Sequence, residues 1–152
     1  MTTEKSISLK SEYKIYAIYP EKFKKIQLQD NLTQNDLIHS LSTDLNRKRI
    51  FKAGKGGGRS GSFFFFSNDS KLVVKTLRGE EKQVLVTMLD TYIAYFEKVP
   101  NSLISKIYGV YTLEIQDLKS IDVIIMQNTQ NLIKPKNKLL EFDLKGSLHK
   151  RF

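Results

Sequence analysis

Residues 54–76 read GKGGGRSGSFFFFSNDSKLVVKT, and this stretch contains the clearest strand and loop signals of the chain. Glycine fills five of the eight positions from 54 to 61. The phenylalanine run 63–66 and the β-branched run 72–76 both favour strands, and the Ser-Asn-Asp-Ser segment between them is typical of a turn. With a further strand expected before the glycines, the order strand, glycine-rich loop, strand, turn, strand predicts part of an antiparallel sheet.

The glycine-rich loop is a candidate anion site. Glycine lets the backbone approach a ligand closely, and backbone N–H groups in such a turn can converge on phosphate oxygens. Lys55 and Arg59 add positive charge, and the short pattern G-x-G-x-x-G is matched by Gly56, Gly58 and Gly61. A dinucleotide-binding fingerprint is excluded because a strand follows the loop, and a Walker A loop is excluded because no Gly-Lys-Ser/Thr follows the spacer. A solvated loop without a ligand is the alternative at this point.

The segment after these strands predicts one long helix over residues 80–98. Its apolar residues recur on one face, which we expect to pack against the sheet: Leu85, Met88, Leu89, Tyr92 and Phe96.

Lys75 and the first turn of this helix predict an ion pair. Glu81 lies four residues before Leu85 and therefore on the apolar stripe, whereas Glu80 is rotated about 100° away from it. A carboxylate that faces the sheet is costly unless it is paired, and Lys75 is the natural partner. We favour Glu81 over Glu80. Two alternatives stay open: an outward-facing Lys75, and glutamates that act only on the helix dipole.

Shorter elements are expected around this segment. Residues 1–12 are polar and expected to be loose, and the alternating apolar residues of 13–19 predict a strand. Pro20 favours a short helix that turns Phe23 and Ile26 inward. The other expected elements are a helix over 34–45 capped by Thr33 and Asp36, strands over 105–115 and 121–126, a polar loop over 127–138, and a short strand over 139–145. The fold class is therefore α+β, an antiparallel sheet of about five to seven strands with one long helix packed on one face.

The composition limits the partners. The chain has no cysteine, which excludes disulfides and thiolate metal sites. The N-terminus lacks the apolar core of a signal peptide, and no apolar run approaches the ~18 residues of a membrane-spanning helix. A formal charge of +9 favours polyanionic partners such as nucleic acid, nucleotide phosphates or an acidic membrane face. Nucleic acid is disfavoured because no motif that reads it is present.

The order of parts resembles the N-terminal lobe of a kinase, in which a glycine-rich loop covers ATP and a strand lysine pairs with a helix glutamate. More narrowly, residues 13–151 resemble the phosphatidylinositol phosphate kinases of the phosphatidylinositol 4-phosphate 5-kinase type. Motifs in the family's order carry the resemblance: Gly-Arg-Ser-Gly-Ser-Phe-Phe-Phe-Phe at 58–66, Val-Lys-Thr at 74–76, Pro-Asn-Ser-Leu-Ile-Ser-Lys-Ile-Tyr-Gly at 100–109, Ile-Ile-Met-Gln-Asn at 124–128, and Phe-Asp-Leu-Lys-Gly-Ser at 142–147. Arg59 and Gln127 depart from the family's usual lysine and asparagine.

This resemblance implies a lipid kinase that uses ATP and Mg²⁺ to phosphorylate an inositol-ring hydroxyl of a phosphatidylinositol monophosphate. Lys75, oriented by Glu81, would hold the ATP phosphates together with the loop residues Gly56, Gly57, Gly58, Arg59, Ser60, Gly61 and Ser62. The adenine would contact the hinge residues Met126, Gln127 and Asn128, and the active site would be bordered by Asp143 and Lys145.

The family's magnesium-binding and catalytic acids follow the Asp-Leu-Lys-Gly-Ser motif, and this sequence does not contain them. We therefore expect residues 13–152 to form an N-terminal lobe truncated after that motif, with no metal site of its own and no activity without a C-terminal lobe. The face that such a lobe would cover is expected to be apolar.

The resemblance also implies a cytoplasmic, peripheral location at the inner face of a membrane, with anionic phosphoinositide lipid as partner, and it permits a homodimer. The alternative is a degenerate paralogue, a non-catalytic module that binds phosphoinositide membranes through the basic run 47–59.

Overall fold

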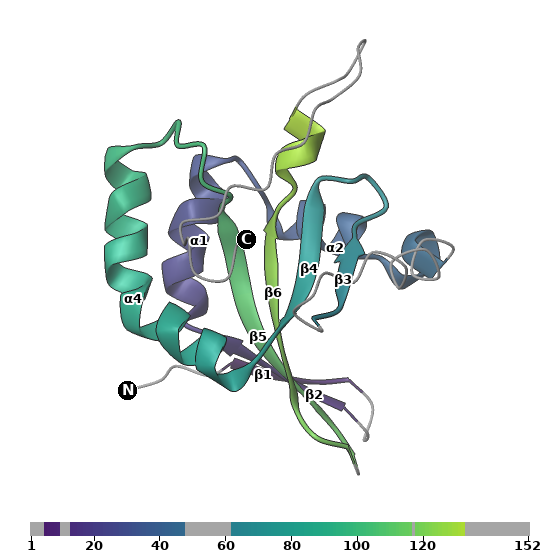
Figure 1. Cartoon of the computed structure of the whole chain (residues 1–152). Helices are drawn as coiled ribbons and strands as arrows, with labels where there is room; N and C mark the ends of the chain where they lie inside the picture. The colour runs from purple at the N-terminus through teal and green to yellow at the C-terminus, as the bar shows by residue number, and fades with distance from the viewer. Residues whose placement is uncertain (1–4, 10–12, 48–61, 117, 133–152) are drawn as a thin grey trace, which may run out of the picture.

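The computed structural model describes residues 5–9, 13–47, 62–116 and 118–132. They form a six-stranded sheet in the order β1-β2-β5-β6-β4-β3, with helices packed against it (Figure 1). The strands are β1 (Lys5–Leu9), β2 (Tyr13–Ile18), β3 (Phe64–Phe66), β4 (Leu72–Leu77), β5 (Ile107–Ile115) and β6 (Ile121–Gln127). Every neighbouring pair is antiparallel, so the predicted α+β class is confirmed.

One row of paired residues crosses five of these strands. It runs from Ile18 on β2 through Val110, Ile124 and Lys75 to Phe64 on β3. Residues paired across antiparallel strands point to the same face of a sheet, so all five side chains share one face. The three aliphatic members are buried in the hydrophobic core. The charged Lys75 therefore lies directly beside the core, next to Ile124 in this row.

Helix α4 (Gly79–Lys98) covers this face, and its extent matches the predicted long helix. Its core residues are Leu85, Leu89, Tyr92, Ile93 and Phe96. The prediction for Met88 is wrong, because its side chain is 44% exposed and Ile93 is buried in the core. The buried stripe is centred between these two positions, so Met88 falls at its margin.

Helix α1 (Pro20–Gln29) lies beside α4 (Figure 1). Tyr19 takes a left-handed backbone conformation, φ 46° and ψ 53°, which turns the chain sharply from β2 into the helix. Pro20 occupies the first turn, where its missing N–H has no helical partner to lose. Phe23 and Ile26 are buried, as predicted.

Helix α2 (Gln34–Ser40) begins with the predicted cap. Thr33 Oγ1 accepts the N–H of Asp36 at 3.1 Å, and the Thr33 N–H donates to the Asp36 carboxylate at 2.8 Å. The predicted end at residue 45 is wrong, since α2 stops at Ser40 and helical backbone resumes only over 43–47. The Ser40 carbonyl accepts side-chain and backbone N–H groups of Asn46 and Asn68, which compete with a continuous helix.

The expectation of a loose N-terminal segment is wrong for β1. This strand pairs along its whole length with β2, from Lys5 opposite Ala17 to Leu9 opposite Tyr13. The pairing satisfies backbone N–H and C=O groups on the outer edge of β2. Because these hydrogen bonds are made by the backbone, the side-chain pattern does not predict them.

Two other expectations concern neighbouring segments. A short 3₁₀ helix, η1 (Thr129–Leu132), interrupts the predicted polar loop. The predicted strand over 139–145 lies outside the described residues. Within the described ranges, no helix is both long enough and apolar enough to cross a membrane.

Candidate functional site

Strand β4 and helix α4 bring Lys75 and Glu81 together. Lys75 Nζ donates to Glu81 Oε1 at 3.1 Å, and the two side chains are 21% and 27% exposed. The ring centre of Phe64, the β3 partner of Lys75, lies 6.0 Å from the ammonium nitrogen. Glu80 is exposed to solvent. The predicted contact is therefore present, and the alternative of an outward-facing, unpaired Lys75 is wrong.

The second carboxylate oxygen of Glu81 caps its own helix. It accepts the backbone N–H of Arg78 at 2.9 Å, and Arg78 Nε lies 3.7 Å from it. The Arg78 N–H is the main reason that the pKa of Glu81 lies below its ordinary value; burial opposes the shift, and the hydrogen bond from Lys75 adds to it. Pairing with Lys75 and stabilising the start of the helix are thus two roles of one side chain.

The end of the glycine-rich segment lies beside Lys75. Ser62 is buried, and the next residue, Phe63, exchanges two hydrogen bonds with Thr76. The Phe63 N–H donates to Thr76 Oγ1 at 2.9 Å, and the Thr76 N–H donates to the Phe63 carbonyl at 3.0 Å. The other predicted phosphate-binding residues lie outside the described part of the chain: Gly56, Gly57, Gly58, Arg59, Ser60 and Gly61.

Met126, the first predicted hinge residue, shares a face with Lys75. It follows Ile124 by two positions on β6, and Ile124 is the direct partner of Lys75. A separation of one strand and two residues places the Cα atoms of Met126 and Lys75 roughly 8 Å apart. The structure thus brings a predicted adenine contact and the predicted phosphate contact onto one surface.

Gln127 and Asn128 are held by the main chain on both sides. The Gln127 N–H donates to the Lys106 carbonyl at 2.8 Å, and the Asn128 N–H donates to the Lys71 carbonyl at 2.9 Å. The Asn128 amide also donates to the Ser70 carbonyl at 2.7 Å. A ligand that used either backbone N–H would first have to displace one of these hydrogen bonds.

A polar cluster beside the site was missed by the sequence reasoning. Lys82 Nζ donates to Asp122 Oδ1 at 2.7 Å and to Thr112 Oγ1 at 2.9 Å. The Thr112 hydroxyl donates in turn to Asp122 Oδ1 at 2.6 Å. A signal was present, since Asp122 is the one acid in the apolar run 121–126.

A second missed cluster supports the end of β6. Lys106 is buried and donates from Nζ to Asp30, the residue that ends α1. The Tyr108 hydroxyl donates to the other oxygen of Asp30 at 2.6 Å, and burial raises the pKa of Tyr108, with Asp30 adding to the shift. Because the Lys106 carbonyl holds Gln127, this cluster fixes the predicted hinge to α1.

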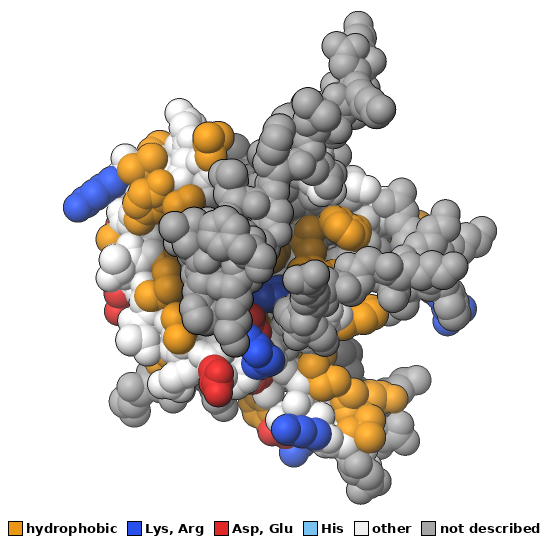
Figure 2. Space-filling view, in the orientation of Figure 1, with side chains coloured by type: hydrophobic (Ala, Val, Ile, Leu, Met, Phe, Trp, Pro, Cys, Tyr) orange, Lys and Arg blue, Asp and Glu red, His pale blue; other side chains and the backbone are white. Residues whose placement is uncertain are grey.

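Charged side chains of both signs gather beside the lower turns of α4 (Figure 2). Among the described residues, no three His, Cys, Asp or Glu side chains lie close enough together to hold a metal ion. Asp143 and Lys145, the predicted border of the site, lie outside the described residues. The described part of the site therefore offers a paired ammonium group, contributed by Lys75.

One protein-family model matches more than half of the chain. The family model for phosphatidylinositol-4-phosphate 5-kinase matches residues 45–152.

Several curated proteins are similar over most of the chain. A probable phosphatidylinositol phosphate kinase of Dictyostelium discoideum is 31% identical over 131 residues, covering 85% of this chain and 18% of that protein. A phosphatidylinositol 4-phosphate 5-kinase of Schizosaccharomyces pombe is 31% identical over 92% of this chain and 18% of its own length. The type-1 alpha enzyme of Rattus norvegicus is 28% identical over 91% of this chain and 24% of its own length. The chain thus spans about a fifth of the length of these relatives.

Proposed function

Because the chain belongs to the phosphatidylinositol-4-phosphate 5-kinase family, whose members are lipid kinases, we propose that it supplies the ATP-binding part of such an enzyme. In the reaction, the bond between the γ-phosphorus of ATP and its bridging oxygen breaks. A new bond forms to an inositol-ring hydroxyl of a phosphatidylinositol monophosphate, and that hydroxyl loses its proton. The products are ADP and the bisphosphate. This activity is assigned to the whole enzyme, of which this chain would bind the nucleotide.

The contact between Lys75 and Glu81 is the observation that carries this proposal. A lysine ammonium has three N–H donors, and the pair with Glu81 uses one of them. The others are available to phosphate oxygens. Pairing with a carboxylate also offsets the cost of placing an ammonium group on a half-buried surface. Glu81 would thus orient Lys75, as the equivalent glutamate does in kinases.

The adenine is assigned to the end of β6. Met126 shares the face of Lys75 and offers a thioether that adapts to a flat ring. The occupied N–H groups of Gln127 and Asn128 favour contacts through side chains or through backbone further along the chain.

The phosphates are assigned to Lys75, Ser62 and the loop residues 56–61. Asp143 and Lys145 would border the same site. Because the described residues hold no cluster of three His, Cys, Asp or Glu side chains, the ligands of a magnesium ion and the group that activates the hydroxyl would come from outside them. Residues 13–152 would thus act as an N-terminal lobe beside a C-terminal lobe.

The test of this proposal is ATP binding by Lys75→Met. We expect at least a tenfold loss of affinity by calorimetry, because an ion-paired donor to phosphate is worth about 1.5–3 kcal/mol. Lys71→Met is the matched control, since Lys71 is exposed on the same β3–β4 hairpin and lies 3.9 Å from Asp69. Equal affinity in the two variants would remove Lys75 from the nucleotide site.

A vesicle experiment separates the kinase from the non-catalytic alternative. The chain is mixed with labelled ATP, Mg²⁺ and vesicles containing a phosphatidylinositol monophosphate, alone and with a longer family member's C-terminal part. Labelled bisphosphate only in the mixture supports an ATP-binding part at an anionic membrane surface. Vesicle binding without any nucleotide binding favours the lipid-binding module.

A further inference from the structure

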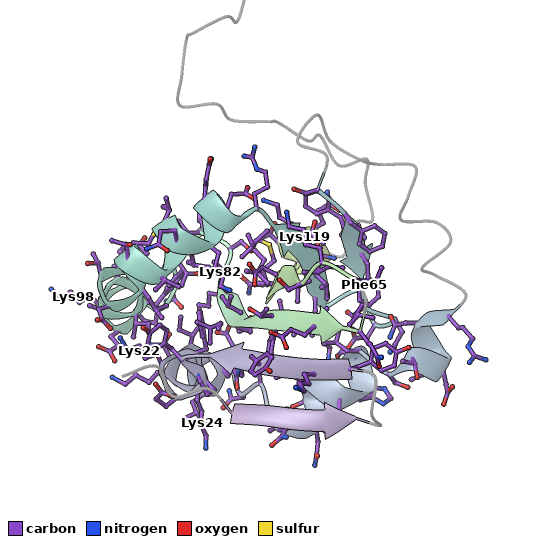
Figure 3. The ribbon with its side chains drawn as sticks, turned by 90° about the horizontal axis from the view of Figure 1, so that it is seen from below. Lys22, Lys24, Phe65, Lys82, Lys98 and Lys119 are labelled. Atoms are coloured by element: carbon purple, nitrogen blue, oxygen red, sulfur yellow. The ribbon has the colours of Figure 1, made fainter. Side chains whose placement is uncertain are left out.

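Two lysine–carboxylate pairs of opposite direction join the start of α4 to the sheet. In the first, the sheet supplies the cation, Lys75, and the helix supplies Glu81. In the second, the helix supplies the cation, Lys82, and the sheet supplies Asp122 at 2.7 Å. Lys82 reaches from α4 toward the strands (Figure 3).

The two pairs hold the helix at two separate points. Asp122 is the partner of Leu77, two residues beyond Lys75, so Lys75 and Asp122 share a face with Cα atoms roughly 8 Å apart. Glu81 and Lys82 are consecutive in the helix, and their side chains diverge by about 100°. A helix held by one pair can turn about that contact. When both pairs are made, such a rotation separates at least one of them.

The second pair belongs to a triangle of hydrogen bonds that also includes Thr112. The Thr112 hydroxyl accepts from Lys82 and donates to Asp122 at 2.6 Å, so all three side chains are hydrogen-bonded to each other. The Lys82 and Asp122 side chains are only 28% and 19% exposed. Hydrogen bonds in a partly buried network are stronger than the exposed ion pairs that contribute almost nothing.

We infer that Lys82, Asp122 and Thr112 are positioning residues, which hold α4 at the rotation in which Glu81 meets Lys75. They act through the helix and not on the ligand. In kinases this lysine–glutamate pair must be in place for phosphoryl transfer, and the position of the helix controls it. The inference rests on the proposed function for its nucleotide part, whereas its structural part is independent of any ligand.

Thr112→Val and Lys82→Met are the test variants. Thr112→Val keeps the size of the side chain and every charge, and removes only the bridging hydroxyl. The first control is Thr87→Val, because the Thr87 hydroxyl bonds the Gln83 carbonyl on the exposed side of α4. The second is Lys22→Met, because Lys22 pairs at 2.5 Å with Asp90, further along the same helix.

Amide hydrogen exchange, measured without nucleotide, reports how firmly the first turn of α4 is held. The N–H of residue 82 donates to the Arg78 carbonyl at 3.0 Å and reports on the first turn of α4. We expect this amide to exchange about tenfold faster in Thr112→Val and Lys82→Met, and at an unchanged rate in both controls. An unchanged rate in both test variants would overturn the inference.

ATP affinity, measured with and without Glu81→Gln, tests whether these residues affect nucleotide binding through Glu81. We expect Thr112→Val to weaken binding about fivefold, and this loss to disappear in the Glu81→Gln background. Lys82→Arg should restore the affinity that Lys82→Met loses. An equal loss with and without Glu81 would overturn the positioning role. If the unaltered chain bound no ATP, the proposed function would fail, while the exchange rates would still decide whether these residues hold α4.

Discussion

Glu81 shows how much depends on the position of a single carboxylate. One of its oxygens accepts the Arg78 N–H and the other accepts from Lys75. The sequence predicted this pair because only Glu81, and not Glu80, shares the apolar stripe of the helix. It did not predict the bond to Arg78, because that bond depends on where the helix begins. Lys82 was missed for the opposite reason: a lysine next to the stripe is usually solvated, and only the strand register brings Asp122 beneath it.

The lowered pKa of Glu81 predicts a pH-dependent contribution to stability. A carboxyl whose folded-state pKa lies below its unfolded value of about 4.3 stabilises the fold above that pH. The contribution is lost as the pH falls through the folded-state pKa. We therefore expect Glu81→Gln to have a lower Tm than the unaltered chain at neutral pH, and the difference to shrink as the pH falls below the unfolded-state pKa.

Thermal unfolding of both proteins across this pH range makes the measurement. The pKa values of Asp36 and Asp69 are lowered as well, so the acid sensitivity of one protein alone would not isolate Glu81. A Tm difference that stayed constant with pH would contradict the assignment.

At the scale of elements, side-chain periodicity predicted the long helix correctly. It did not predict the elements whose extent depends on backbone hydrogen bonds. Helix α4 has twenty residues with a repeating apolar face, and its position was predicted within one residue of each end. Strand β1 and the early end of α2 depend on backbone pairing with β2 and on carbonyl groups taken by Asn46 and Asn68. The site residues on regular elements, Lys75, Glu81 and Met126, could be placed for the same reason, because each lies on a strand or helix with a readable period.

Where α1 meets the start of β5, we expect the single substitution Asp30→Asn to reduce the free energy of unfolding strongly. Asp30→Asn leaves the buried ammonium of Lys106 without its counter-charge, and breaking such a pair costs about 3 kcal/mol or more. Urea unfolding measures the loss. Replacing Lys106 by Met in the same variant should recover a large part of it, since no buried charge is then left unpaired.

Glu97→Gln is the matched control for Asp30→Asn. Glu97 on α4 pairs with Lys25 on α1 at 3.1 Å, but this pair is exposed. Its removal should cost less than about 1 kcal/mol. Similar costs for the two substitutions would show that burial of Lys106 contributes nothing special.

At the scale of the whole molecule, one set of exposed apolar side chains follows α4 and the segment after it. Figure 2 shows apolar side chains over the outer side of this helix. The exposed residues are Val84, Met88, Tyr95, Val99, Leu103 and Ile104. Leu103 is 98% exposed and contributes nothing to the core. Apolar patches of this kind favour association with other proteins or with a second copy.

Leu103→Ser combined with Ile104→Ser should therefore reduce self-association without loss of stability. The expected Tm change is about 1 °C or less, because neither side chain is buried. Sedimentation velocity over a concentration series measures the association. Leu118→Ser is the control, since Leu118 is 66% exposed but lies between β5 and β6. The prediction fails if the control lowers association as much as the double variant does.

The order of strands also decides when the sheet can be completed during synthesis. Strand β2 pairs with β5, and Tyr16 and Glu114, hydrogen-bonded across that pair, are 98 residues apart in the chain. At about 5–20 residues per second, a ribosome finishes β5 roughly 5–20 s after β2. During that interval β1 and β2 can form only a two-stranded hairpin, which is marginally stable in water. A chaperone that binds nascent chains would therefore meet these two strands before β5, their partner in the sheet, has been synthesised.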